Sequence, residues 1–252
     1  MMDRKILKCI RTIDEFSLEE YERLDIGVEI QDFTEPNLTD TDIMELVQRY
    51  KKLFSHFKGI KSLHGPFLDL KPASPDPDIR RVSYKKYLRT LKAAKELEMD
   101  YIIFHSQINP YLNDPYLMEL NNIQTREFWH EVLEEINDFR GTILIENIFE
   151  PIPDFLKERV EKIAIPNIKI ILDVGHARLG SVSLEQWVRE MKDHLVYVHL
   201  HSNDGKHDQH RIPSELELLA LKSLFSKYDI NPVISLEYKS DNPSREIEIL
   251  RS

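Results

Sequence analysis

The stretch IKIILDVGHA (residues 168–177) decides the fold that this sequence predicts. Its first half is a short, mainly aliphatic run with β-branched residues, which is typical of a strand buried on both faces of a parallel sheet. The run ends directly before Asp173, and His176 follows three residues later. The stretch therefore joins a strand signal to two side chains that can bind a metal.

Seven more runs of this kind occur along the chain, and longer segments separate them. The eight runs are residues 6–10, 26–30, 60–63, 101–104, 142–145, 168–172, 196–200 and 233–236. The separating segments carry apolar residues at three-and-four spacing, typical of amphipathic helices, most clearly in residues 43–57, 84–94 and 128–139. Eight strand–helix units predict one α/β domain over residues 1–252, folded as a (β/α)8 TIM barrel. An open doubly wound sheet is the alternative, but no GxGxxG motif follows any run.

Short motifs mark the expected ends of the helices. Ser17, Ser183 and Ser214 each precede a Glu or Gln by three residues, which is the spacing of a capping box. Gly59 and Gly141 each follow a helical segment and precede a run, so we expect them to end those helices in the left-handed conformation. Each of these residues falls at a boundary between a strand and a helix.

The composition limits the classes of function. The chain has 252 residues and a formal net charge of −10, which argues against a broad basic face for nucleic acid. Cys9 is the single cysteine, so no internal disulfide can form. No apolar stretch has the length of a signal peptide or of a membrane span. We therefore expect a cytoplasmic protein without a membrane partner.

Six of the eight runs end at a residue that can bind a metal, and a D-x-H pair follows in a later loop. In chain order these residues are His64, His105, Glu146, Asp173 with His176, His199, Asp208 with His210, and Glu237. Strand ends of one polarity converge at the C-terminal mouth of a barrel, so the side chains would become neighbours there. Imidazole and carboxylate together suit Zn²⁺, Mn²⁺, Co²⁺ or Fe²⁺, and because no cysteine joins these residues, a Cys-type structural zinc site is excluded. The sequence therefore predicts a metal site at the C-terminal mouth.

The remaining histidines are expected to have no part in this site. His56, His130 and His194 lie in helical segments and are expected at the surface or in packing contacts. His201 and His207 lie near the mouth, where we expect solvated loop histidines. Any one candidate ligand taken alone would more often be a surface residue, so the prediction depends on the offset that recurs from run to run.

Six motifs carry a resemblance to a known family. They are LHGPF (63–67), FHS (104–106), IEN (145–147), LDVGHA (172–177), VHLHSNDGKHDQH (198–210) and SLEY (235–238). With them the sequence resembles the xylose isomerase-like (β/α)8-barrel superfamily, which includes sugar phosphate isomerases and epimerases and endonuclease IV-type proteins. The resemblance covers nearly the whole chain.

The resemblance implies three groups of metal ligands. Glu146, Asp173, His199 and Glu237 match the four-ligand site of the sugar isomerases and epimerases. His64 and His105, bridged by Glu146, match a second site of the endonuclease IV branch, and a third site is matched by His176, Asp208 and His210. One to three divalent ions are therefore expected, with zinc, manganese, cobalt or magnesium as candidates.

Two departures separate this chain from the endonuclease branch. That branch carries a Cys-rich segment around the positions of Asp173 and His176, where this chain reads LDVGHA. It also follows its D-x-H pair with a Gly-containing turn, whereas Arg211 and Pro213 follow His210 closely here. Both departures, like the acidic balance, argue against a nucleic-acid substrate.

We expect a metal-dependent isomerase or epimerase of a small sugar, sugar phosphate or polyol. Glu146 and Glu237 are the expected catalytic residues, one removing a proton and the other returning it through an enediolate. Contacts to the substrate are expected from His176, Arg178, Lys206 and Arg211. The alternatives are an endonuclease IV-like phosphodiesterase, acting at abasic DNA with a multinuclear zinc centre, and a non-catalytic binding barrel. Assembly into a homo-oligomer stays open.

Overall fold

The barrel is closed by hydrogen bonds between its first and last strands. The computed structural model describes residues 4–240 and 242–252, and in them eight parallel strands pair in chain order, with β8 returning to β1. The strands are β1 (Ile6–Ile10), β2 (Gly27–Ile30), β3 (Lys61–His64), β4 (Tyr101–His105), β5 (Thr142–Glu146), β6 (Ile168–Asp173), β7 (Leu195–Leu200) and β8 (Val233–Leu236). The predicted TIM barrel is confirmed.

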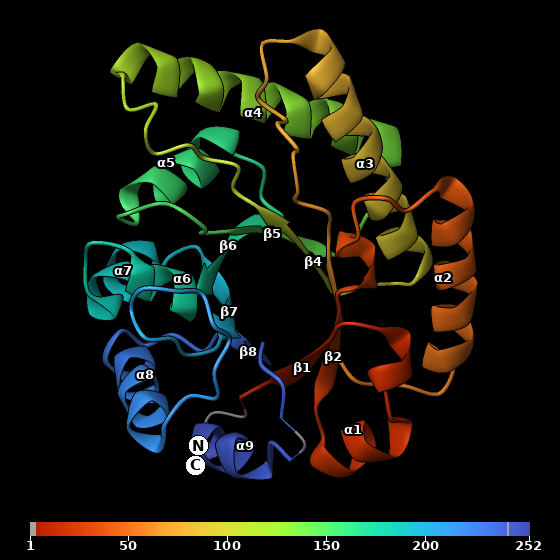
Figure 1. The fold of residues 1–252 in the computed structure, drawn as a ribbon, viewed down its shortest axis with the longest axis vertical. Helices are drawn as coiled ribbons and strands as arrows, with labels where there is room; N and C mark the ends of the chain where they lie inside the picture. Colours follow the sequence, from red (N-terminus) through yellow and green to blue (C-terminus); the bar gives the residue numbers. More distant parts are fainter. Residues whose placement is uncertain (1–3, 241) are drawn as a thin grey trace.

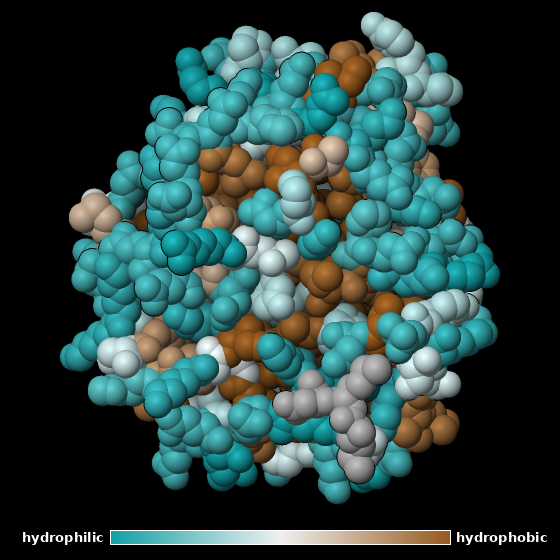
Figure 2. Space-filling model, turned by 180° about the vertical axis from the view of Figure 1, so that it is seen from behind, coloured by the Kyte–Doolittle hydropathy of each residue, from teal (hydrophilic) through white to brown (hydrophobic). Residues whose placement is uncertain are grey.

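Helices surround the strands as an outer ring (Figure 1). In the described residues they are α1 (Leu18–Leu24), α2 (Asp40–Phe54), α3 (Pro77–Glu96), α4 (Pro115–Ile136), α5 (Asp154–Ile163), α6 (Val174–Leu179), α7 (Leu184–Met191), α8 (Glu215–Lys227) and α9 (Ser244–Arg251), with short 3-10 helices η1 (Ile13–Glu15) and η2 (Asp32–Thr34). No helix in this described part combines the length and apolar character needed to cross a bilayer. From the opposite side, polar residues cover most of the periphery and apolar residues are visible near the centre (Figure 2).

Four strands extend one residue beyond the ends of the runs that predicted them. β3, β4, β5 and β6 include their candidate ligands, because parallel pairing continues through these positions. His105 is paired with Glu146, and Asp173 with His199, across neighbouring strands. The candidate ligands of β3 to β7 are therefore held by the sheet, whereas His176 lies in α6, Asp208 and His210 lie in the loop after β7, and Glu237 directly follows β8.

The alternation of side chains along each strand places the candidate ligands inside the barrel. Leu7, Ile103, Leu144, Ile171, Tyr197 and Val233 form one buried apolar cluster, separate from the larger core that includes the helices. Successive residues of a strand point to opposite faces, so residues two apart share a face. His105, Glu146, Asp173 and His199 each lie two residues beyond a member of this cluster. A polar layer therefore lies above an apolar layer in the barrel interior.

The helix ends differ from the predicted motifs in two respects. Ser17 and Ser183 accept a backbone N–H as N-caps, but the complete capping box is present only for Ser214 among the three. Gly59 and Gly141 are not left-handed, so that prediction is wrong; within the described residues the single glycine with positive φ is Gly205. A Cβ at Gly59 would clash with the ring of Phe57, and one at Gly141 would lie 2.7 Å from the oxygen of Met99. Glycine is needed there for close packing.

Candidate metal centre

His199 lies at the centre of the polar layer. Its Nδ1 is 3.3 Å from Glu146 Oε1, 3.2 Å from Glu237 Oε2 and 3.7 Å from Asp173 Oδ2. One ligand atom from each of these four residues lies within 4.8 Å of all the others. The residues come from β5, β6, β7 and the position directly after β8, so the barrel brings together side chains that are far apart in the sequence.

The chemistry of this group fits a divalent cation. Glu237 Oε2 is buried and has no hydrogen-bond partner among the described residues. In the same part of the chain, the cationic side chains within 4.0 Å of Glu146, Asp173 and Glu237 are all histidines, with no lysine or arginine. Three converging buried carboxylates repel one another unless a cation compensates them. Nitrogen and oxygen ligands of this kind suit zinc, manganese or cobalt.

The carboxylates respond differently to this environment. Burial raises the pKa of Glu146, but the charges of His199 and His105 outweigh burial and hold this pKa well below its usual value. Burial also raises the pKa of Glu237; the charge of His199 opposes burial, whereas the charges of Asp173 and Glu146 reinforce it, and the net pKa is raised. In the absence of a cation, the surroundings therefore shift the pKa values of the two glutamates in opposite directions.

Further candidate ligands surround the four-residue group. His64 Nε2 is 3.2 Å and His105 Nε2 3.6 Å from Glu146 Oε2. On the other side, Asp208 Oδ2 lies 3.3 Å from His176 Nε2 and 3.1 Å from His210 Nε2. The structure thus brings all nine predicted ligands to one end of the barrel, in clusters that overlap at shared carboxylates.

His201 joins the nine predicted ligands at this end of the barrel, although the sequence predicted a solvated loop residue. It is 1% exposed, and its Nε2 lies 3.1 Å from Asp173, so it is not a solvated loop residue. Its ring stacks on His210 with centroids 4.0 Å apart. A Cβ at Gly175 would clash with Cε1 of His201, so the glycine of LDVGHA makes room for this imidazole. His207, by contrast, is exposed as expected.

Glu29 is a buried partner of His199 that sequence reasoning missed. It is fully buried, with Oε1 2.9 Å and Oε2 3.0 Å from His199 Nε2, and the hydroxyl of Tyr197 donates to Oε2 at 2.8 Å. Burial raises the pKa of Glu29, but the charge and hydrogen bond of His199 outweigh burial and lower it. Alternation along residues 26–30 was the available signal, because Glu29 falls on the inward face of an otherwise apolar run.

The Glu29 contact fixes which nitrogen of His199 can bind a metal. An ionised carboxylate can only accept, so Nε2 carries the proton and donates it to Glu29. Nδ1 faces the three carboxylates, so with a metal bound it would be the nitrogen that offers its lone pair to the ion. Gln31 extends the network, since its amide donates to Glu237 Oε1 at 2.8 Å.

A cavity of about 1640 Å³ opens onto this centre. Seven of the nine predicted ligands line it, namely His64, His105, Glu146, His176, Asp208, His210 and Glu237. Asp173 and His199 do not line it, contrary to expectation, because both are fully buried beneath the others. The cavity is therefore open to Glu146 and Glu237, the two predicted catalytic residues.

The basic residues expected to contact substrate lie elsewhere. Arg178 donates to Ser202 at 2.8 Å and pairs with Glu217, so α8 holds its guanidinium. Lys206 and Arg211 are exposed, and the backbone of Arg211 pairs with that of Ser202. None of these three lines the cavity, whereas His176 does. The basic side chains that do line it are Arg11, Lys71 and Arg159, in loops and a helix that carry no recognisable motif.

Comparisons with known proteins agree with this geometry. Residues 25–252 match a family model described as xylose isomerase-like TIM barrel. The uncharacterized protein MJ1311 of Methanocaldococcus jannaschii is 28% identical over 211 residues, covering 79% of this chain and 68% of that protein.

Two solved structures have a similar fold. One is the TTHB071 protein from Thermus thermophilus, soaked with ZnCl2, with a TM-score of 0.77, 24% identity, and coverage of 99% of this chain and 98% of that chain. The other is a D-tagatose 3-epimerase-like protein with a TM-score of 0.73, 22% identity, and coverage of 97% and 94%. At these identities the likeness concerns the fold alone.

Proposed function

This chain belongs to the xylose isomerase-like TIM barrel family, and from that premise we propose that it is a metal-dependent isomerase or epimerase of a small sugar, sugar phosphate or polyol. One observation carries the proposal. Glu146 and Glu237 project from different strands, approach one another within 4.8 Å around His199, and both line the same cavity. The similar fold of a D-tagatose 3-epimerase-like protein supports the same class of reaction.

Glu146, Asp173, His199 and Glu237 would hold the principal ion. When bound, a divalent metal acts as a Lewis acid that polarises the substrate carbonyl. His64 and His105 beside Glu146, and His176 with Asp208 and His210, provide ligands for a second and a third ion. Zinc, manganese, cobalt and magnesium are the candidates, and the zinc soak of a structural neighbour is consistent with the first.

The two glutamates would carry the proton transfer. With a ketose in the cavity, one carboxylate removes the proton from the carbon next to the carbonyl, and the other returns it, through an enediolate. His176 would orient the substrate: its Nδ1 lies 2.9 Å from the carbonyl oxygen of Asn147 and donates to it, which fixes the ring at the cavity wall. Because Arg178, Lys206 and Arg211 lie away from the cavity, Arg11 and Lys71 are the better candidates for a phosphate contact.

The second candidate is a phosphodiesterase acting at abasic DNA, similar to endonuclease IV. It is favoured by the presence of all three clusters of ligands at one mouth. A net charge of −10 opposes it, because duplex DNA is bound largely through contacts to phosphates.

Deuterium exchange distinguishes the two candidates. The metal-loaded protein should incorporate solvent deuterium next to the carbonyl of at least one member of a panel of ketoses and ketose phosphates. Glu237→Gln should lower this rate by about 10²–10⁴-fold because the amide cannot accept the proton. Glu131→Gln, on the surface of α4, is the matched control. Metal-dependent incision of abasic duplex DNA, with no exchange into any ketose, would reverse the choice.

A further inference from the structure

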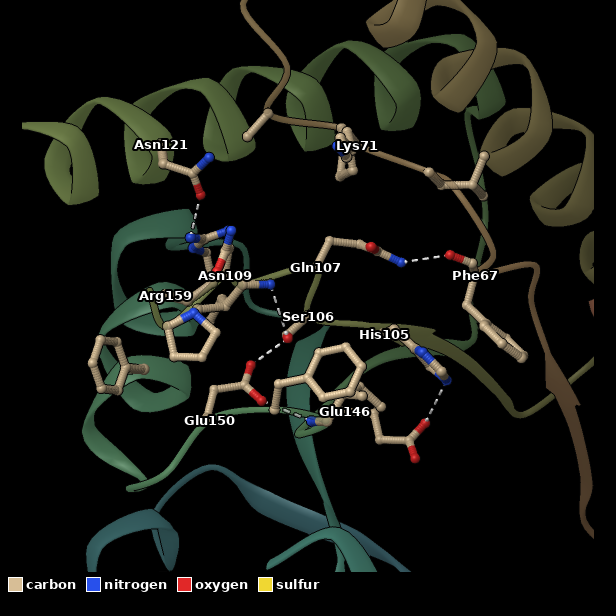
Figure 3. Close-up of a pocket in the computed structure, with 18 of the residues that line it drawn as sticks. Phe67, Lys71, His105, Ser106, Gln107, Asn109, Asn121, Glu146, Glu150 and Arg159 are labelled. Carbon is tan, nitrogen blue, oxygen red and sulfur yellow. Dashed lines mark hydrogen bonds and ion pairs between the residues drawn. The ribbon is translucent and has the colours of Figure 1, made fainter. Parts of the chain in front are cut away.

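The cavity continues beyond the candidate metal centre into a second region. We call it the distal compartment and define it by Ser106, Asn109, Asn121, Glu150 and Arg159, all of which line the cavity. Figure 3 shows Arg159, Asn121 and Glu150 at the end of the cavity away from His105 and Glu146, with Ser106 and Gln107 between the two ends. Neither the metal centre nor the two catalytic glutamates account for these side chains.

Arg159 brings a buried positive charge to this compartment. It is 5% exposed and donates to three oxygens of α4: from Nε to Asn122 at 2.6 Å, and from its two Nη atoms to Thr125 at 2.8 Å and Asn121 at 2.5 Å. Across residues 4–240 and 242–252, its guanidinium forms no ion pair within 4.0 Å. A guanidinium has five N–H groups, so two remain after these bonds.

Glu150 brings a buried negative charge to the same compartment. It is 3% exposed, and its oxygens accept from the hydroxyl of Ser106 and from the backbone N–H of Ile148, the latter at 2.7 Å. Its carboxylate also lacks an ion pair with any lysine or arginine in the described part of the chain. Both groups are held rigidly by neutral partners and keep free hydrogen-bonding capacity. Burying such charges is costly unless polar groups meet them.

This pair of charges selects a class of ligand. An anionic group attracted by Arg159 would be repelled by Glu150, and a cationic group attracted by Glu150 would be repelled by Arg159, so the pair of opposite charges gives little net attraction for a singly charged ligand. A hydroxyl group can accept from Arg159 and donate to Glu150, and the amides of Asn109 and Asn121 add donors and acceptors. A neutral group with several hydroxyls therefore satisfies the compartment best.

The size and the outer wall of the cavity favour a further sugar ring. Its volume of about 1640 Å³ exceeds the roughly 300–1,000 Å³ typical of pockets for drug-sized ligands. Exposed apolar side chains line its outer part, and among them Tyr111 and Phe149 offer flat rings to the C–H faces of a sugar. A single monosaccharide at the metal centre would leave most of this space unused.

We infer that the distal compartment binds a second sugar unit, so that the preferred substrate is a glycosylated ketose and not a free monosaccharide. This inference rests on the proposed function, which places the reacting carbonyl at Glu146 and Glu237. The hydrogen bonds from Arg159 to α4 hold its guanidinium in a fixed position before the ligand arrives, which lowers the entropic cost of binding.

Calorimetric titration of the metal-loaded protein tests the inference. The probes are D-fructose and three glucosyl-fructoses linked through O3, O4 and O6 of fructose, namely turanose, maltulose and isomaltulose. At least one disaccharide should bind tenfold or more tightly than D-fructose. If none of the three binds more tightly than D-fructose, or if no probe binds at all, the inference is overturned.

Variants then locate the second sugar unit. The gain in affinity for the disaccharide is the logarithm of the ratio between the dissociation constants of D-fructose and of the disaccharide. Arg159→Met and Glu150→Gln should each reduce this logarithm by at least half, and they should change the dissociation constant of D-fructose by less than twofold. Arg80→Met, a partly exposed arginine of α3 paired with Glu131, is the control and should change neither affinity. Because Arg159→Met loses three contacts between α4 and α5, Asn109→Ala provides a milder variant in the same compartment. Equal loss for both ligands, or none, in Glu150→Gln and Asn109→Ala contradicts the assignment.

The exchange assay separates the two proposals. Exchange into fructose and the disaccharides at equal catalytic efficiency would keep the proposed function and overturn the second-sugar inference. If disaccharide binding depends on Glu150 but no ketose takes up deuterium, the assignment of the distal compartment as a sugar site stands. The proposed isomerase or epimerase reaction is then overturned.

Discussion

At the scale of single residues, Glu29 shows how a side chain outside the candidate ligand set can orient one of its members. It holds Nε2 of His199 through both oxygens and so turns Nδ1 toward Glu146, Asp173 and Glu237. Carboxylates in this position fix the ring orientation and raise the basicity of a ligating histidine. The arrangement makes the orientation of His199 the best defined among the candidate ligands.

Glu29→Gln is therefore expected to weaken metal binding by about 10–100-fold, the usual range for an outer partner of a ligand. The amide keeps an acceptor for Nε2 but removes the negative charge. Competition with a chromophoric zinc chelator measures the affinity without any substrate. Asp32→Asn is the matched control, because Asp32 is a half-buried carboxylate that accepts from Tyr50 and from the N–H of Ile13, away from the candidate ligands. Equal affinities of wild type and Glu29→Gln would remove Glu29 from this role.

The limits of prediction are also clearest at this scale. The candidate ligands were predictable because each falls at the same offset in a recurring pattern. Glu29 was not predicted, because a glutamate within a four-residue strand resembles an ordinary surface position until the inward face is known. Arg159 was missed for a different reason: it lies within a helix, and only packing of α5 on α4 brings it to the cavity. Arg178 was wrongly expected to contact the substrate, because its ion pair with Glu217 of α8 could not be foreseen from the local sequence.

At the scale of elements, the strands were predicted more accurately than the helix ends. Runs of aliphatic residues suffice to locate eight buried strands, since every strand of a barrel is covered on both sides. The ends of helices depend on the backbone conformation of single residues, and residue type predicts this conformation less well than aliphatic runs predict buried strands. Asp25 and Ala164 adopt the left-handed conformation after α1 and α5, whereas the glycines expected to do so are constrained by close contacts.

The complete capping box at the start of α8 gives a prediction at this scale. Ser214 accepts from the N–H of Glu217, and the Glu217 carboxylate accepts from the N–H of Ser214 at 2.7 Å. Ser214→Ala should lower the free energy of unfolding by about 0.5–2 kcal/mol, the usual cost of losing an N-cap. Ser226→Ala, in the last turn of the same helix, is the control and should be near neutral. Chemical denaturation followed by circular dichroism compares them; equal effects of the two substitutions would show that the cap contributes nothing particular.

At the scale of the whole molecule, the candidate metal centre and the closed barrel depend on one another. The four-residue group joins β5, β6, β7 and the end of β8, so the positions of its carboxylates are fixed only when the barrel is closed. A cation that binds this folded arrangement and not the unfolded chain stabilises the fold by mass action.

Removal of the metal should therefore lower the melting temperature, and restoring zinc or manganese should raise it again in a concentration-dependent manner. Differential scanning calorimetry before and after chelation measures both changes. Asp173→Asn, which weakens the group at a fully buried position, should reduce the shift produced by added metal. A melting temperature that is the same with and without tightly controlled metal would exclude a resident ion at this centre.

The contact between Glu29 and His199 has a consequence for how the molecule opens. It runs from β2 to β7 through the barrel interior, while Gln31 joins the end of β2 to Glu237 after β8. Both links therefore bridge the seam at which β8 meets β1. Strands on the two sides of the seam should lose amide protection from hydrogen exchange together, in one cooperative event. The contacts of Glu29 with His199 and of Gln31 with Glu237 would then both orient the candidate site and resist separation of the strands at the seam.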